Sequence, residues 1–285
     1  MTIKLCTDTF SLKDPHSLKT YLDNDGYQAW KSIVREQTPK SKIIEKIKDS
    51  GLRGKGGAGF LTGLKWSFIP LMDGQKYLVC NSDESEPGTC KDRDILRYNP
   101  HAIIEGMLIA SYAIGASVGY NYLRGEFMDE QWKVFNDAIS EAYKEKFVGK
   151  NILSSNITID LYALIGAGAY IVGEETAMLE SIEGKRGMPR IKPPFPAIKG
   201  LYGKPTIINN TETLASIPKI MLNKPGWYKS LGVDDAEGMK IFCMSGHINN
   251  PGNFEIALGT PFSKLLDLAG GILNQKKIKA VIPGG

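Results

Sequence analysis

The chain has 285 residues, of which 42% are hydrophobic and 23% are charged. This composition is ordinary for a folded globular protein, and it excludes a disordered chain, a collagen-like repeat and a small disulfide scaffold. The 35 Lys and Arg residues exceed the 31 Asp and Glu residues by four, and they form no basic block. We therefore expect no nucleic-acid partner.

Four cysteines are scattered along the chain: Cys6, Cys80, Cys90 and Cys243. They form no C-x-x-C pair and have no neighbouring histidines, so we expect reduced thiols and no metal site in this chain. The first residues, MTIKLCTDTF, lack the cationic start and apolar run of a targeting peptide. The most apolar stretch, 102–123, contains Glu105 and Asn121, which argues against a direct membrane span.

Residues 1–50 are predicted to be a helical lead-in, because apolar residues recur at helical spacing from 23 to 50 and Gly51 suits a helix end. Residues 51–237 then alternate between strand and helix patterns. We expect strands at 77–80, 118–122 and 157–161, and helices at 99–115, 132–143, 174–183 and from 210 onward. This alternation predicts an α/β domain with a Rossmann-like, mostly parallel sheet and helices on its faces.

Residues 238–285 follow a different pattern, which predicts a small separate α+β module. Its expected elements are a strand at 240–244, a turn at 250–252, a second strand, a helix at 261–269 and a last strand at 278–282. The sequence reaches its last residue without a closing element, so we expect the module to be incomplete.

The strongest local motif is the glycine-rich segment GLRGKGGAGFLTGLKW. Gly54, Gly56, Gly57 and Gly59 permit close backbone approach to a phosphate, although a dinucleotide fingerprint requires a preceding strand and a helix pattern precedes here. A mobile glycine hinge is the alternative. The cations Arg53, Lys55 and Lys65 suit phosphate, and the rings of Phe60, Trp66 and Phe68 suit either stacking on a base or core packing.

An acidic segment, NSDESEPG, follows the first predicted strand. Asp83, Glu84 and Glu86 place three carboxylates within four residues, where they can accept hydrogen bonds from the hydroxyls of a ribose or ribityl chain. The alternative is a solvated acidic turn that pairs with nearby cations. These cations are Lys91, Arg93 and Arg97.

Two further motifs lie downstream. In GAGAYIVGEETAM, Glu174 and Glu175 open a helix, which suits the helix dipole and needs no ligand. In RIKPPFPAIKGLYGKPTIINNTETLAS, the Asn209–Asn210 pair offers amides for the edge of a heterocycle. The three histidines lie outside any nucleophile motif, which disfavours hydrolysis but not flavin chemistry, because a flavin needs no side-chain base.

Taken together and in this order, the motifs resemble the flavoprotein subunits of respiratory complex I, which are the NADH- and FMN-binding F chains of bacterial NADH-quinone oxidoreductase. The resemblance covers residues 26–285. It implies hydride transfer from NADH to FMN, followed by one-electron transfer through iron–sulfur clusters toward quinone. Flavin subunits of NAD-linked hydrogenases and formate dehydrogenases are the alternative within this fold, and a non-catalytic SLBB-type binding module is the alternative from another class.

The resemblance also implies the site residues. Those implied to bind FMN are Gly54, Gly56, Gly57, Asn81, Asp83, Glu84, Ser85, Tyr170, Gly173, Glu174, Asn209, Asn210 and Thr211. Those implied to bind NADH are Phe60, Lys65, Phe68, Glu86, Glu175, Lys192 and Phe195. Of these, Glu86 and Glu175 are the expected catalytic residues.

Residues 238–285 resemble the family's ubiquitin-like SLBB domain. Family members continue into a helical domain whose four cysteines hold a 4Fe-4S cluster, and we expect this domain to be absent from this chain because the cysteine run is missing. The implied partners are a thioredoxin-like 2Fe-2S subunit and the large iron–sulfur subunit of the peripheral arm. The implied location is cytoplasmic, on the inner face of the bacterial plasma membrane.

Overall fold

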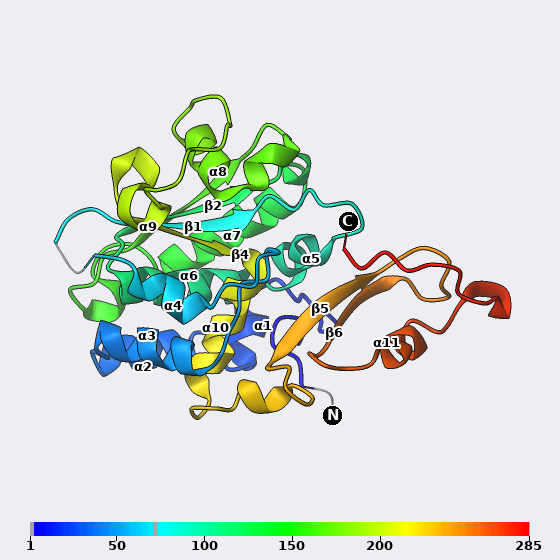
Figure 1. Ribbon diagram of the computed structural model, residues 1–285. Helices are drawn as coiled ribbons and strands as arrows, with labels where there is room; N and C mark the ends of the chain where they lie inside the picture. The colour runs from blue at the N-terminus through cyan, green and yellow to red at the C-terminus, as the bar shows by residue number, and fades with distance from the viewer. Residues whose placement is uncertain (1–2, 71–72, 285) are drawn as a thin grey trace.

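The computed structural model describes residues 3–70 and 73–284, and its centre is a four-stranded parallel sheet (Figure 1). The strand order is β3-β2-β1-β4. The strands are β1 (Tyr77–Ser82), β2 (Val118–Leu123), β3 (Asp160–Ile165) and β4 (Thr206–Asn210). The predicted α/β class with a parallel sheet is therefore confirmed. The third strand begins later than predicted, because Ile159 forms only an isolated bridge with Gly149.

The sequence analysis did not predict strand β4. Its pattern, TIINN, is only five residues long and runs directly into a helix, so no alternation marks it. In the structure β4 pairs with β1 in parallel, with Cys80 opposite Asn209 and Asn81 opposite Asn210. The sheet thereby brings two segments more than 100 residues apart in sequence to the same edge.

Helix α6 (Pro100–Ile114) is the centre of the core, and all but one of its residues are buried. It begins at a proline, whose fixed φ suits the first turn, and ends at Gly115 with a φ of +76°. Helix α10 (Thr211–Leu222) packs against it so closely that a Cβ on Gly106 would lie 2.0 Å from the carbonyl oxygen of Leu214. Only glycine permits this approach.

Other helices pack on the two faces of the sheet, and α8 lies on the face opposite α6 and α10 (Figure 1). They are α4 (Thr62–Ser67), α5 (Lys91–Tyr98), α7 (Gln131–Lys144), α8 (Glu175–Ile182) and α9 (Pro196–Lys199). Within the described residues, no helix is long and apolar enough to cross a membrane.

The N-terminal region forms three short helices, α1 (Leu18–Asp23), α2 (Gln28–Arg35) and α3 (Lys40–Asp49), and Gly51 follows α3 with a φ of +72°. Their apolar residues belong to the same hydrophobic core as α6. A buried carboxylate holds them there, because Glu105 of α6 accepts hydrogen bonds from the backbone N–H groups of Tyr27 at 2.8 Å and Trp30 at 3.0 Å.

The C-terminal region contains an antiparallel pair, β5 (Met239–Met244) and β6 (Gly252–Ala257), followed by α11 (Phe262–Leu268). The predicted last strand at 278–282 is wrong: this segment has no regular secondary structure and pairs with no strand among the described residues, and Ile282 is 81% exposed. An extended segment forms a strand only when a neighbour supplies ladder hydrogen bonds.

Candidate functional site

Four separate segments meet at the carboxyl ends of β1 and β4 (Figure 1). The amide of Asn81, near the end of β1, donates to the carbonyl oxygen of Gly173 at 2.9 Å. A Cβ built on Gly56 would lie 3.3 Å from the Cβ of Asn210, at the end of β4. The glycine loop, the acidic segment, the GAGAY segment and the Asn209–Asn210 pair are therefore neighbours.

The glycine loop follows helix α3 and precedes α4, so it is not the strand–loop–helix of a dinucleotide fingerprint. Gly57 has a φ of +126°, and a Cβ built on it would meet no described atom within 4 Å. The loop thus presents open space beside its backbone at this residue.

Lys55 does not add charge to this open side. Its side chain is buried, its Nζ donates to the carbonyl oxygen of Met239 at 2.6 Å, and burial lowers its pKa. Lys55 instead joins the glycine loop to strand β5.

The three carboxylates of the acidic segment have different surroundings. Glu84 accepts hydrogen bonds from the N–H groups of Asp92 at 2.8 Å and Arg93 at 2.9 Å, at the start of α5, and its burial raises its pKa to about 8. Glu86 accepts a hydrogen bond from the hydroxyl of Tyr170 at 2.5 Å. The acidic loop is therefore not the solvated turn paired with cations that the sequence left open.

Asp83 is the exception among these carboxylates. It is buried, and neither of its carboxylate oxygens has a hydrogen-bond partner among the described residues. Burial raises its pKa to about 6, although nearby Ser85 and the charge of Arg124 act in the opposite direction. Buried polar groups in native proteins are almost always hydrogen-bonded, so these oxygens are available to accept hydrogen bonds from a ligand or from water.

A chain of alternating charges joins four elements around the site. Nζ of Lys65 lies 2.9 Å from Oε2 of Glu175 and donates to the carbonyl oxygen of Ile208 at 2.8 Å. Nζ of Lys192 lies 2.9 Å from Oε1 of Glu174 and 3.6 Å from Oε1 of Glu175. Helix α4, strand β4, helix α8 and the proline-rich loop are thus held around one cluster of charges.

Glu174 also caps helix α8. Its Oε2 accepts hydrogen bonds from the N–H groups of Thr176 at 2.8 Å and Ala177 at 2.9 Å. Burial favours the neutral carboxyl, but the bonds from the first turn of α8 and from Lys192 outweigh burial and hold the pKa of Glu174 below its ordinary value. The carboxylate is therefore charged at neutral pH.

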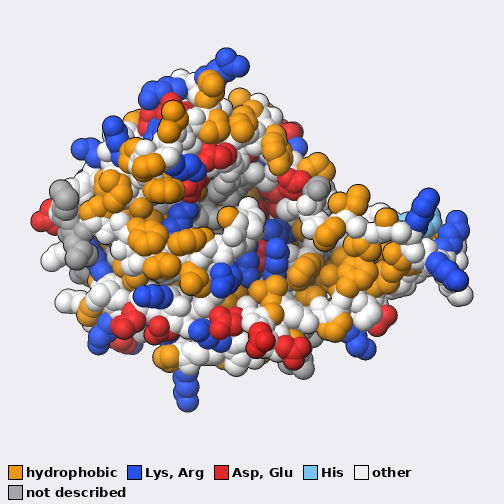
Figure 2. All heavy atoms as spheres, viewed as in Figure 1, with side chains coloured by type: hydrophobic (Ala, Val, Ile, Leu, Met, Phe, Trp, Pro, Cys, Tyr) orange, Lys and Arg blue, Asp and Glu red, His pale blue; other side chains and the backbone are white. Residues whose placement is uncertain are grey.

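The aromatic residues divide into exposed and buried groups. Phe60 and Phe68 are 48% and 50% exposed with ring centroids 6.1 Å apart, and Phe195 is 59% exposed. Trp66 is fully buried, and its indole N–H donates to Oδ1 of Asn209 at 2.8 Å. The phenylalanines are available for stacking on a planar ligand, whereas Trp66 is part of the core. Figure 2 shows a hollow on this face that contains both acidic and basic side chains, with hydrophobic side chains around it.

The indole of Trp66 leads to a stability prediction. We expect Trp66→Phe to lower the free energy of unfolding by about 1–3 kcal/mol, because the buried oxygen of Asn209 loses its donor. Urea denaturation measures this change. The control is Trp132→Phe, on the half-buried face of α7, and an equal loss in both variants would contradict the role of the hydrogen bond.

A buried polar network lies next to the Asn209–Asn210 pair and holds it in place. The sequence analysis did not predict this network. The ammonium of Lys91 lies 2.7 Å from Asp92 and 3.0 Å from Glu212, and the amide of Asn210 donates to Asp92 at 2.6 Å. Thr211 is buried, and its hydroxyl donates to the carbonyl oxygen of Asn81 at 3.2 Å. The only sequence signal was the unusual density of charge after Cys90.

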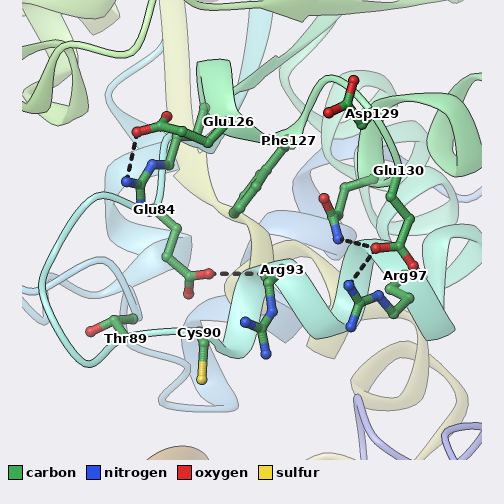
Figure 3. A pocket seen from close by; sticks show the side chains of 11 residues that line it. Glu84, Thr89, Cys90, Arg93, Arg97, Glu126, Phe127, Asp129 and Glu130 are labelled. Atoms are coloured by element: carbon green, nitrogen blue, oxygen red, sulfur yellow. Dashed lines mark hydrogen bonds and ion pairs between the residues drawn. The ribbon is translucent and has the colours of Figure 1, made fainter.

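A separate cavity of about 400 Å³ lies next to the acidic segment and shares Glu84 with it. Figure 3 shows Glu84 reaching the start of α5 and Arg97 meeting Glu130. Arg124 lies 2.7 Å from Glu126 in the same cavity. Because these cations already pair with carboxylates, the cavity does not present a strong site for an anion. Within the part of the chain that the structure describes, no three His, Cys, Asp or Glu residues group as metal ligands.

Comparison with known proteins identifies two families in the chain. Residues 47–219 match the model of the Nuo51 FMN-binding domain, and residues 241–282 match the model of the SLBB domain. The first match includes all four segments of the candidate site.

Curated relatives and solved structures agree with this assignment. The F subunit of NADH-quinone oxidoreductase from Rickettsia bellii (strain OSU 85-389) is 52% identical over 95% of this chain, and the F 2 subunit from Rhizobium meliloti (strain 1021) is 49% identical over the same share. The chain spans 65% of the length of each. A crystal structure of an air-oxidized NAD+-reducing [NiFe]-hydrogenase matches 95% of this chain and 43% of its own, with 35% identity and a TM-score of 0.77. The chain therefore belongs to the Nuo51 FMN-binding domain family, and its C-terminal part matches an SLBB domain.

Proposed function

We propose that this chain binds FMN at the carboxyl ends of β1 and β4 and oxidises NADH there, as the flavoprotein subunit of a complex I-type NADH-quinone oxidoreductase. The observation that carries the proposal is the buried carboxylate of Asp83, which has no partner among the described residues and lies in the segment that follows β1. The names of the relatives and the FMN-binding family support it.

The residues present fit FMN. The ribityl chain of FMN carries hydroxyl donors, which the orphan oxygens of Asp83 can accept. The open space beside Gly57 admits close approach of the cofactor to the backbone. We propose that Asn81 and Gly173, which are already joined by a hydrogen bond, border the ring system together with Tyr170. When bound, FMN supplies the chemistry by accepting a hydride.

We propose that the remaining residues assigned to FMN hold the segments around this space in position. They are Gly54, Gly56, Glu84, Ser85, Glu174, Asn209, Asn210 and Thr211. Hydrogen bonds from several of them to neighbouring residues, in particular that from Asn210 to Asp92, fix the carboxyl ends of β1 and β4 before a ligand arrives.

We further propose that NADH binds over the exposed rings of Phe60, Phe68 and Phe195, which offer flat apolar faces to the adenine. Lys65 and Lys192 then lie within reach of the pyrophosphate, while Glu175, between them, orients both ammonium groups. In this proposal Glu86 and Glu175 position the reacting dinucleotide, and no side chain needs to transfer a proton.

This arrangement predicts preference for NADH over NADPH. A 2′-phosphate would meet the carboxylates of Glu86 and Glu175 rather than a dedicated arginine, so we expect kcat/KM for NADH to exceed that for NADPH by at least about tenfold, or ~1.4 kcal/mol. Steady-state oxidation with ferricyanide as acceptor measures both constants. Glu86→Gln should narrow the ratio, and equal constants in the unmodified protein would refute the assignment.

The partner subunits and the route of the electrons are also part of the proposal. We propose that the electrons leave toward quinone through a thioredoxin-like 2Fe-2S subunit and a large iron–sulfur subunit, in a peripheral arm on the cytoplasmic face of the plasma membrane. The 4Fe-4S cluster of the longer family members would need a run of cysteines that residues 1–285 do not contain. A flavin subunit of an NAD-linked hydrogenase is the second candidate, favoured by the likeness to the hydrogenase structure.

Two experiments test these proposals. Retention of FMN by the purified chain after gel filtration tests the cofactor, and failure to retain it would favour a non-catalytic SLBB-type binding module. Identification of the subunits that co-purify with the tagged chain separates a quinone reductase from a hydrogenase or formate dehydrogenase.

A further inference from the structure

Two of the four cysteines meet where the FMN-binding domain contacts the SLBB region. Cys90 immediately precedes helix α5, and Cys243 lies in strand β5, 153 residues later. The backbone N–H of Cys90 donates to the Sγ of Cys243 at 3.3 Å. Both cysteines are free thiols and only partly buried.

This contact brings the two cysteine side chains to the same backbone N–H group. The Sγ of Cys90 is three covalent bonds from the same backbone nitrogen that lies 3.3 Å from the Sγ of Cys243. Both sulfurs therefore flank one N–H group. Formation of a disulfide requires rotation about χ1 and a small backbone adjustment that bring the two sulfurs to a separation of ~2 Å.

Asn253 of β6 holds the two segments in this position. It faces Cys243 in the β5–β6 ladder, and its Nδ2 donates to the carbonyl oxygen of Cys90 at 3.1 Å and to Asp94 at 2.7 Å. The thiol of Cys90 donates to Oδ1 of the same asparagine at 3.4 Å. The pair is thus fixed by contacts from a third segment, strand β6, and not only by the two cysteines.

The surroundings give the two thiols different reactivity. The hydrogen bond with Cys243 and then the charge of Arg93 lower the pKa of Cys90 to about 6, against burial and Asp94. The hydrogen bond with Cys90 and burial raise the pKa of Cys243. Glu84 is the remaining carboxylate that acts on the pair, and it raises the pKa of Cys243. A thiolate is the nucleophilic form of cysteine, so Cys90 is the attacking sulfur and Cys243 the resolving one.

We propose that Cys90 and Cys243 form a reversible disulfide when the protein meets a peroxide, and that this bond ties the acidic segment to the SLBB region. The Cys90 thiolate attacks one peroxide oxygen and becomes a sulfenic acid as the O–O bond breaks and the first water leaves. The Cys243 sulfur then attacks the sulfenic sulfur, the S–S bond forms and the second water leaves. Two thiols lose two electrons and two protons, and hydrogen peroxide takes them up to give two waters.

The bond has a structural consequence for the candidate site. Cys90 ends the loop that begins at Asp83, and oxidation covalently closes this loop onto β5. A dithiol reductant reopens it by thiol–disulfide exchange. The disulfide can be tested without FMN or NADH, so its failure and the failure of the proposed function are distinguishable.

The chain carries its own controls in Cys6 and Cys80. Both are buried, and burial raises the pKa of each, that of Cys80 to about 12. In the reduced full chain exposed to excess hydrogen peroxide at pH 7.5 and then alkylated, we expect two of the four thiols to be lost. Peptide mass spectrometry should locate a single Cys90–Cys243 linkage, which dithiothreitol removes.

Two conservative variants separate the roles of the sulfurs. Cys243→Ser should leave a Cys90 sulfenic acid that dimedone traps, and Cys90→Ser should leave Cys243 unmodified. Iodoacetamide labelling of Cys90 in the unmodified chain should reach half its maximal rate at a lower pH than labelling of an ordinary cysteine, because the pKa of Cys90 is lowered. Four intact thiols after peroxide treatment, a linkage to Cys6 or Cys80, or linkages only between chains would overturn the proposal.

Discussion

A Gly57→Val substitution is expected to abolish FMN binding while the protein still folds. The φ of Gly57 is +126°, and its missing side chain faces open space in which we place the cofactor. Valine would put three carbon atoms into this space and would remove the close approach of the backbone. Loss of FMN is measured by the flavin absorbance that remains with the protein after gel filtration.

Valine also strains the backbone at a positive φ, so a matched control is needed. Gly74 has a φ of +132° and no described atom within 4 Å of a built Cβ, and it lies before β1, at the end of the sheet away from the site. Both variants should lose about 1–3 kcal/mol of stability from strain, but Gly74→Val should keep its FMN. Stoichiometric FMN in Gly57→Val would show that the loop does not contact the cofactor.

Asp83→Asn is expected to have opposite effects on the free protein and on FMN binding. In the free protein the change removes a buried charge that has no partner among the described residues, so we expect stability at pH 7 to rise by about 1 kcal/mol. Hydrogen bonds to a charged acceptor contribute about 1.5–3 kcal/mol, so FMN affinity should fall by roughly tenfold to a hundredfold. Urea denaturation and fluorescence titration of FMN measure the two effects.

The same carboxyl predicts a pH dependence with a defined sign. The pKa of Asp83 in the folded protein, about 6, exceeds its ordinary value of 3.8, so the folded state holds the proton more tightly than the unfolded state. The free protein should therefore lose stability as the pH rises from about 4 to about 6, and Asp83→Asn should lack this loss. FMN affinity should weaken below pH 6, where Asp83 is protonated. Identical pH profiles in both proteins would contradict this role.

The helices and strands that we predicted correctly are those whose apolar spacing and end signals extend over several adjacent residues. Helix α6 has a proline start, an apolar run and a glycine end, and strands β1 and β2 carry dense apolar patterns, so their positions followed from adjacent residues. Strand β4 has only five residues, and its place beside β1 is decided by pairing across the chain. The segment 278–282 has strand composition but no partner among the described residues, which composition does not reveal.

The candidate site shows the same division. The sequence motifs identified the segments that meet at the site, because a glycine loop and carboxylates after a strand can be recognised from adjacent residues. The direction of individual side chains depends on the fold. Lys55 and Trp66 lie in motifs that suggested ligand contacts, yet both side chains are buried and bonded within the protein. Lys91, read as a possible surface partner of the acidic segment, is buried in the network below Asn210.

The central claim is that NADH reduces FMN held by this chain, and one anaerobic titration tests it most directly. The purified chain is loaded with FMN, freed of excess cofactor and mixed with NADH while the visible spectrum is recorded. We predict that the absorbance of the oxidised flavin disappears with one NADH consumed per bound FMN, and that ferricyanide restores it. A chain that holds FMN but keeps its oxidised spectrum in the presence of excess NADH would contradict the account.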